Sequence, residues 1–237
     1  MKIIRLTCNW CSDEELYRRF KRTYISKLNH NKNISFTLSD EYDLLVIINK
    51  PHADHVSFEK EKTLGVIMEP TWSCGINGYM RDLSETCKYI MYHAAPTNQY
   101  IYYPGLLPFH FDYDDGEDLD FYIESKQKKV KKCSIVTSLA THKPSMSTLY
   151  HKRVKMVEDI LKSDLDIDIY GKGWDAYMHK DSRIKGNVEN KKDALIDYEF
   201  SIAIENCSER DYFTEKLTDC ILLDTTPIYY GCPKIDR

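Results

Sequence analysis

The sequence has 237 residues, of which 42% are hydrophobic and 30% charged, a balance typical of a globular protein with one large domain or two small ones. Its formal net charge of -4 gives no general cationic surface, so we expect neither nucleic acid nor an anionic membrane as the main partner. No stretch approaches the roughly 18 uninterrupted apolar residues of a membrane helix, and the first residues do not read as a signal peptide, so we expect no membrane anchor and a cytoplasmic location.

Eight cysteines are scattered through a chain that is long enough to fold without disulfides, and we expect them to be reduced thiols. Cys8 and Cys11 form one CxxC motif. A zinc site usually needs a second pair at a suitable spacing, and the sequence has none. Metal binding at this motif stays open as the less favoured interpretation.

Short apolar runs predict four strands in the first half, at residues 3–9, 43–49, 63–68 and 88–94. After the first of them, Ser12 and Glu15 form a capping box that predicts the start of a helix. The apolar face of this helix would carry Tyr17, Phe20, Tyr24 and Leu28.

An acidic run followed by a basic run spans residues 110–132, and such a change in composition usually marks a surface connection. We therefore expect two domains, at residues 1–125 and 126–237. Within the connection, Asp112 and Asp114 fit either a divalent cation site or, as the favoured interpretation, a solvated loop.

The second half repeats the alternation, with strands predicted at residues 134–139, 166–171, 200–206 and 227–231. One helix is predicted through Tyr150, Val154, Val157 and Leu161, and another through Leu217, Cys220 and Ile221. Alternating strands and helices predict an α/β fold with parallel sheets covered by helices on both faces.

Polar residues are concentrated between the strand at 200–206 and the helix that follows it. Glu205 and Asn206 end the strand, where parallel sheets collect their ligands. Lys216 lies in the first helical turn, which normally favours acidic residues because of the helix dipole. A bound diphosphate would explain this lysine, with Glu215 accepting hydrogen bonds from ribose hydroxyls. A solvated first turn capped by Asp211 is the alternative.

The same stretch resembles the α-1,3-fucosyltransferase family. The strings "FSIAIEN", "DYFTEKL" and "PIYYGCP" are close to the family's pattern over some 30 residues. Upstream, "GVIMEP" at 65–70 looks like the family's acceptor-side segment, and "HKRVKMVEDI…DIDIYGKG" at 151–173 is similar to its donor-side region.

The resemblance implies a GT-B type enzyme, with two Rossmann-like domains facing across a cleft. It implies GDP-fucose as the donor in the C-terminal domain and a glycan acceptor in the N-terminal domain. The residues implied to line the donor site are Asn206, Tyr212, Glu215 and Lys216, with Lys216 on the diphosphate. Arg153 looks like an upstream phosphate-binding arginine, although a solvated basic face with Lys152 and Lys155 is the alternative.

Glu69 matches the family's general base, and its place suits that chemistry. It follows a predicted strand and precedes Pro70, which ends regular structure at an edge where a site is expected. A carboxylate there can take the proton from an acceptor hydroxyl as it attacks the sugar. A surface turn glutamate is the alternative. Trp10 and His93 are acceptor-side candidates, and His93 fits a structural histidine equally well.

We therefore expect an inverting transfer of fucose from GDP-fucose to a glycan hydroxyl, with no metal and no other cofactor. Two departures from the family are expected: no anchor of the kind that eukaryotic relatives carry, so that the chain resembles the soluble microbial or viral type, and a C-terminal tail that looks short or missing. A transferase for another nucleotide sugar, or a non-catalytic nucleotide or glycan binder, remain the alternatives.

Overall fold

The computed structural model describes residues 1–24, 33–53, 58–94, 96–104, 121–122, 128–139, 148–233 and 235. These residues belong to two compact units, which we call the N-unit (described residues up to 104) and the C-unit (described residues from 121). The predicted boundary after residue 125 falls outside the described residues, so its position stays a prediction.

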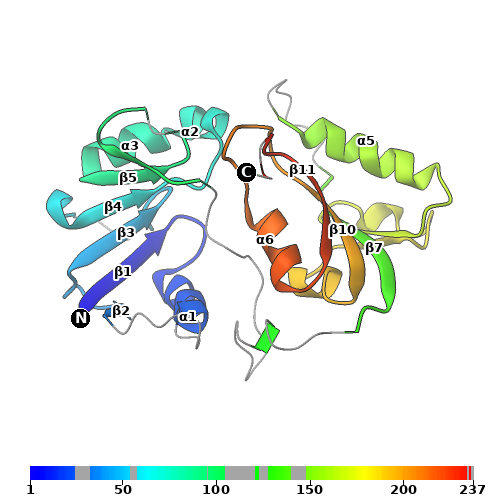
Figure 1. Cartoon of the computed structure of the whole chain (residues 1–237), viewed down its shortest axis with the longest axis horizontal. Coiled ribbons are helices and arrows are strands. Elements are labelled where there is room, and N and C mark those ends of the chain that lie inside the picture. The colour runs from blue at the N-terminus through cyan, green and yellow to red at the C-terminus, as the bar shows by residue number, and fades with distance from the viewer. Residues whose placement is uncertain are drawn as a thin grey trace. The chain divides into compact units, whose positions relative to one another are not determined.

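The N-unit contains a parallel sheet in the order β2-β1-β3-β4-β5-β6 (Figure 1). Its strands are β1 (Lys2–Cys8), β2 (Ile34–Thr37), β3 (Leu44–Ile48), β4 (Thr63–Val66), β5 (Tyr89–Tyr92) and β6 (Tyr100–Tyr102). Its helices are α1 (Asp13–Tyr24), α2 (Thr71–Asn77) and α3 (Tyr79–Thr86), with a short 3-10 turn η1 (Lys60–Lys62). Figure 1 shows α1 on the opposite side of this sheet from α2 and α3.

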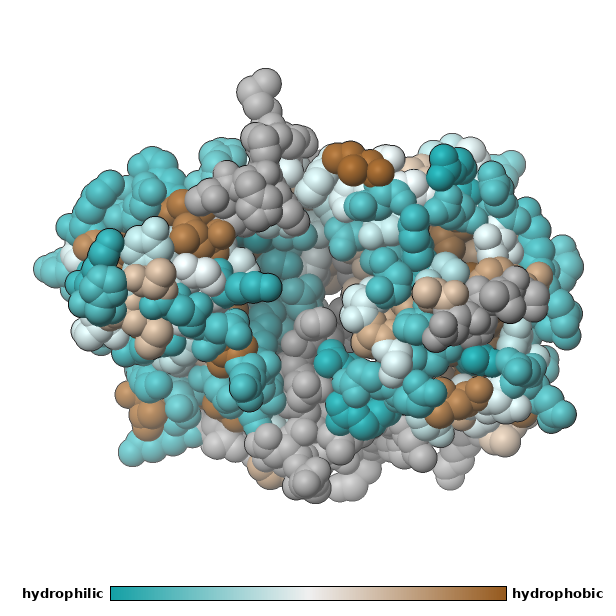
Figure 2. Space-filling model, turned by 180° about the vertical axis from the view of Figure 1, so that it is seen from behind, coloured by the Kyte–Doolittle hydropathy of each residue, from teal (hydrophilic) through white to brown (hydrophobic). Residues whose placement is uncertain are grey.

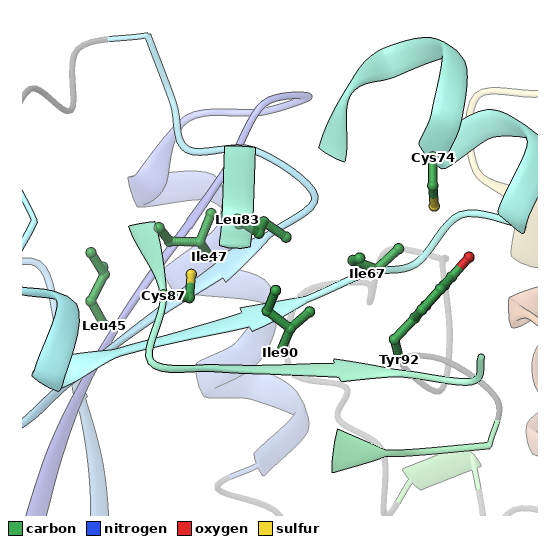
Figure 3. Packing of buried hydrophobic residues seen from close by; sticks show 8 residues of the cluster. All are labelled: Leu45, Ile47, Ile67, Cys74, Leu83, Cys87, Ile90 and Tyr92. Atoms are coloured by element: carbon green, nitrogen blue, oxygen red, sulfur yellow. The ribbon is translucent and has the colours of Figure 1, made fainter. Parts of the chain in front are cut away.

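The N-unit core lies between the sheet and the pair of helices α2 and α3. Leu83 of α3 and Cys74 of α2 point toward the strands in Figure 3. They pack with four buried residues of the sheet and with two residues outside it: Leu45, Ile47, Ile90 and Tyr92 in the strands, Ile67 after β4, and Cys87 after α3. Burial of these side chains on one face fixes the register of the strands, and so fixes which residues stand at their carboxyl ends.

The C-unit contains a parallel sheet in the order β11-β10-β7-β8-β9. Its strands are β7 (Lys131–Val136), β8 (Ile167–Tyr170), β9 (Ile184–Gly186), β10 (Tyr198–Ile204) and β11 (Thr226–Tyr230). Its helices are α5 (Tyr150–Leu161) and α6 (Glu215–Leu222), with 3-10 turns η2 (Asp175–Tyr177) and η3 (Lys191–Ala194). The strand order reverses between β7 and β10, and open α/β sheets bind ligands at such a point.

Helices α5 and α6 cover opposite faces of this second sheet (Figure 1). Val157 and Ile160 of α5 pack with Ile135 and Ile169 of the central strands, and Phe200 and Ile202 of β10 border this cluster. Since both faces are covered, the central strands β7 and β10 have buried residues on both sides, as their sequences indicated.

All eight predicted strands are confirmed, with ends shifted by at most three residues. The helix after Ser12 is confirmed as α1, and the Ser12 hydroxyl accepts a hydrogen bond from the Glu15 amide at 3.2 Å. Leu28, predicted on the same helix, lies outside the described residues. The two helices of the second half are confirmed as α5 and α6.

One predicted helix face is wrong. Ile221 was expected to pack beside Leu217 and Cys220, but it is 61% exposed. Asp219 is fully buried instead, because Lys191 pairs with its carboxylate.

None of the described helices is long and apolar enough to cross a membrane. The surface visible in Figure 2 is mostly hydrophilic, with apolar residues in small separate groups. This surface agrees with the high proportion of charged residues in the sequence.

Candidate functional site

The C-unit site is organised around Glu205, the residue that follows β10. Its carboxylate is completely buried. One oxygen accepts the Thr214 amide at 2.7 Å and the other accepts the Thr214 hydroxyl at 2.7 Å. A side chain at Gly231, after β11, would overlap Glu205, so glycine leaves the room that this carboxylate occupies. Glu205 therefore ties the end of β10 to the start of α6.

Lys216 completes the first turn of α6. Thr214 is the N-cap, and its hydroxyl accepts the Lys216 amide at 3.3 Å. The Lys216 ammonium donates to Glu215 Oε1 at 3.0 Å and lies 3.9 Å from Glu205 Oε2. Burial raises the pKa of Glu205, and Lys216 and Thr214 act against that rise. Lys216, a cation in a first helical turn that normally favours acidic residues, is thus held by two carboxylates.

Arg153 reaches the same strand end from the first turn of α5 and is only 7% exposed. Its Nη2 donates to the Ile204 carbonyl at 2.7 Å and to Asn206 Oδ1 at 2.8 Å. Burial lowers the pKa of Arg153, while the neighbouring Tyr150 and Glu205 oppose the change. Lys152 and Lys155 are exposed. The buried Arg153 therefore does not share the solvated basic face that these two lysines form.

The structure therefore brings four of the five predicted donor residues to one strand end and helix start: Arg153, Asn206, Glu215 and Lys216. The fifth, Tyr212, lies in the turn between them and is buried. In that turn Asp211 has a φ of 62°, a left-handed conformation that aspartate tolerates. The roles of these residues in binding a donor stay predictions.

Sequence reasoning missed two residues of this network, Lys191 and Asp219. The Lys191 ammonium donates to Asp219 Oδ2 at 2.7 Å and to the Glu215 carbonyl at 3.3 Å. Although burial opposes the charge, Asp219 and Glu215 raise the pKa of Lys191 above its ordinary value. The sequence signal that could have revealed this pair is an aspartate between Leu217 and Cys220 on an apolar helix face, because a buried carboxylate needs a cation as its partner.

The N-unit candidates also gather at one edge, because every strand of that sheet is parallel. Trp10 follows β1 and is 44% exposed, Glu69 follows β4, and the buried His93 follows β5. Between β1 and β4, Asn49 ends β3, and its side-chain oxygen accepts the Met68 amide at 2.8 Å. Asn49 was not predicted, and it fixes the backbone just before Glu69.

Pro70 is the N-cap of α2, so Glu69 stands in the turn between β4 and that helix. The Glu69 carbonyl accepts the Cys74 thiol at 3.3 Å. The predicted break in regular structure after the strand is confirmed. Whether the carboxylate acts as a base stays a prediction.

Among the described residues, no three His, Cys, Asp or Glu side chains gather in a way that would hold a metal ion. Cys8 and Cys11 lie with their sulfurs 3.4 Å apart as free thiols. Asp112 and Asp114 lie outside the described residues.

Residues 124–236 match the family model "Glycosyltransferase family 10 (fucosyltransferase) C-term". These residues, just under half of the chain, are similar to the C-terminal domain of glycosyltransferase family 10. The match spans the whole Arg153 to Lys216 network and supports the predicted resemblance to fucosyltransferases.

Two curated proteins are similar to parts of the chain. A "Putative fucosyltransferase-like protein" of Arabidopsis thaliana is 32% identical over 85 residues, which is 36% of this chain and 15% of that protein. "Alpha-(1,3)-fucosyltransferase FucT" of Helicobacter pylori is 41% identical over 51 residues, or 22% of this chain and 11% of that protein. The matches thus span a small part of each relative.

A solved structure described as "Crystal Structure of alpha1,3-Fucosyltransferase with GDP" matches over 99% of this chain and 69% of its own, with a TM-score of 0.51 and 18% identity. At this identity the likeness concerns the fold alone. The predicted fold class, α/β with two Rossmann-like parallel sheets of the GT-B type, is confirmed.

Proposed function

We propose that this protein is a family 10 glycosyltransferase that transfers fucose from GDP-fucose to a hydroxyl group of a glycan acceptor, with inversion at the anomeric carbon. The observation that carries the proposal is the group of charged residues at the end of β10. There Arg153 and Lys216 lie close to Glu205, beside the start of α6 and at the reversal point of the sheet.

Donor binding is the part of the proposal that these contacts support most directly. Lys216 and the start of α6 offer positive charge to a diphosphate, and Arg153 adds a second cation. The Glu215 carboxylate, held at 3.0 Å from the Lys216 ammonium, is available as an acceptor for ribose hydroxyls. As the bond to the sugar breaks, negative charge grows on the leaving GDP, and the same cations stabilise it.

Acceptor activation is assigned to Glu69 in the N-unit. Glu69 stands in the turn after β4, and the side chains of Asn49 and Cys74 hold the backbone of this turn at the Met68 amide and the Glu69 carbonyl. The Glu69 carboxylate would take the acceptor proton while the hydroxyl oxygen attacks the face of the sugar opposite GDP. Trp10 follows β1 and His93 follows β5, at the same edge of the sheet, and both are proposed to contact the acceptor.

We also propose that transfer needs no divalent metal, because Arg153 and Lys216 already supply the positive charge that a metal would bring to the diphosphate. Dialysis against EDTA should leave the rate of fucose transfer unchanged. The control is the same preparation with added manganese. A rate that EDTA abolishes and manganese restores would contradict this part of the proposal and direct attention to Asp112 and Asp114.

The direct test is turnover. The protein is incubated with GDP-fucose, GDP-mannose or a UDP-sugar and a panel of glycans, and products are identified by mass spectrometry, with Glu69→Gln as the matched control. We expect product from GDP-fucose alone, with the anomeric configuration opposite to that of the donor. Product from another nucleotide sugar would instead identify a different transferase. GDP binding without any product would identify a non-catalytic binder.

A further inference from the structure

Lys191 links a distant part of the C-unit to the first turn of α6. It lies in η3, before β10, whereas Glu215 and Asp219 lie 24 and 28 residues later in α6. Its ammonium donates to the Glu215 carbonyl at 3.3 Å and to Asp219 Oδ2 at 2.7 Å. A single side chain therefore connects the beginning and the middle of this short helix.

Asp219 explains why the connection is strong. Its carboxylate is completely buried under α6, where an ionised carboxylate is stable only when it is paired and hydrogen-bonded. Lys191 provides the pairing cation, and its own side chain is only 18% exposed. Removing the ammonium alone would leave a buried charge without this partner.

The same ammonium also acts on Glu215. It lies 3.9 Å from Glu215 Oε1, and the Lys216 ammonium lies 3.0 Å from that same oxygen. Two cations thus flank one carboxylate oxygen, while the Lys191 hydrogen bond holds the backbone carbonyl of the same residue. This arrangement restricts both the main chain and the side chain of Glu215, and it leaves Lys216 shared between Glu205 and Glu215.

We propose that Lys191 is a positioning residue for donor binding, acting through Glu215 and the first turn of α6. The inference rests on the proposed function, since it needs Glu215 and Lys216 to contact the nucleotide. Lys191 itself stays paired with Asp219 and does not touch the donor. Its contribution is the fixed placement of two groups that do, and such preorganisation is expected to act on affinity.

The test compares GDP affinity, measured by calorimetry, with the urea-unfolding midpoint for a set of variants. Lys191→Met should weaken GDP binding about 10-fold, the scale of one charge-assisted hydrogen bond, and raise KM for GDP-fucose while kcat changes little. Lys191→Arg should recover most of the affinity. Lys155→Met is the matched control, because Lys155 pairs with Asp159 at 2.9 Å on the exposed face of α5.

A second variant separates positioning from plain stability. In Lys191→Met/Asp219→Asn no buried charge is left unpaired, so the unfolding midpoint should return close to that of the wild type. Affinity for GDP should stay about 10-fold weaker, because the Glu215 contacts are still missing. This double variant also keeps the test valid if Lys191→Met alone fails to fold.

The outcomes are distinct. If the double variant recovers wild-type GDP affinity, Lys191 serves only to neutralise Asp219, and the inference is wrong. The inference is also wrong if Lys191→Met folds and binds GDP as the wild type does. A wild-type protein that binds no GDP at all would instead overturn the proposed function, and the inference with it.

Discussion

At the carboxyl edge of the C-unit sheet, charged side chains from different elements hold one another, whereas at the N-unit edge each candidate follows its own strand. Glu205, Lys216 and Arg153 come from a strand end and two helices and lie within one set of short contacts. Around Glu69, the side chains of Asn49 and Cys74 hold the backbone, at the Met68 amide and the Glu69 carbonyl.

This difference predicts which substitutions change stability and donor binding, and which change the rate alone. A network of buried charges couples binding to the stability of the helix start, because removal of one member leaves another unpaired. When neighbouring groups hold the backbone of a turn residue, a substitution can remove the chemistry of its side chain and leave the fold intact. Donor binding and stability should therefore change together in the C-unit, and rate should change alone in the N-unit.

The largest expected effect is on rate. Glu69→Gln keeps the size of the side chain but removes the proton acceptor, so kcat for fucose transfer should fall by about 10²- to 10⁴-fold. GDP affinity and the melting temperature, measured on the same samples, should stay at wild-type values. Near wild-type turnover would remove Glu69 from the mechanism, and a loss of stability would make its role structural.

The next largest effect is on the unfolding free energy, and it should differ between two helix caps. Thr214→Ala removes the cap of α6 and also one donor to the buried Glu205 carboxylate, so it should cost about 2 kcal/mol of unfolding free energy. Ser12→Ala removes only the exposed cap of α1 and should cost about 0.5 to 1 kcal/mol. Urea unfolding measures both. Equal costs would show that the Glu205 contact adds nothing to the cap.

The smallest effect is on the pH dependence of stability, and it comes from a partly exposed cluster of one glutamate and two arginines in the N-unit. Arg18 and Arg19 lower the pKa of Glu15 to about 2. A carboxylate with a lowered pKa stabilises the fold above its unfolded pKa, and this contribution is lost as the pH falls from about 4.5 toward 2.

Because Glu15 is partly exposed, the contribution should be only a few tenths of a kcal/mol. Urea midpoints of wild type and Glu15→Gln should differ slightly at about pH 6, and the difference should narrow as the pH falls from about 4.5 toward 2. If the difference in urea midpoint does not narrow at low pH, it comes from the geometry of the cap and not from the charge of Glu15.

Sequence patterns predicted the main strands because each is a short apolar run. The edge strand β11 was predicted in the same way, although alternate residues of it are exposed. The patterns did not predict β2, β6 and β9, which have three or four residues and too little pattern to recognise. Helices α2 and α3 were also missed, since Gly75 and Gly78 interrupt their helical period.

The placement of Asn206, Tyr212, Glu215 and Lys216 at one strand end could be predicted because they lie within a few positions of one motif. Arg153 lies 53 residues before Asn206, and only the family resemblance indicated it. Lys191 could not be predicted, because its partners lie 24 and 28 residues away and only the packing of α6 on the sheet brings them together. The error at Ile221 has the same origin, since the helix turns its buried face toward the charged pair of Lys191 and Asp219.

The central claim is that the C-unit network binds a guanine nucleotide through its diphosphate, and titration calorimetry with GDP and UDP tests it most directly. We expect GDP to bind and UDP to bind much more weakly. Lys216→Ala should weaken GDP binding by about 1.5 to 3 kcal/mol, the scale of a hydrogen bond to a charged group, whereas Lys155→Ala on the exposed face of α5 should not. Equal binding of GDP and UDP, or unchanged GDP affinity in Lys216→Ala, would contradict the account.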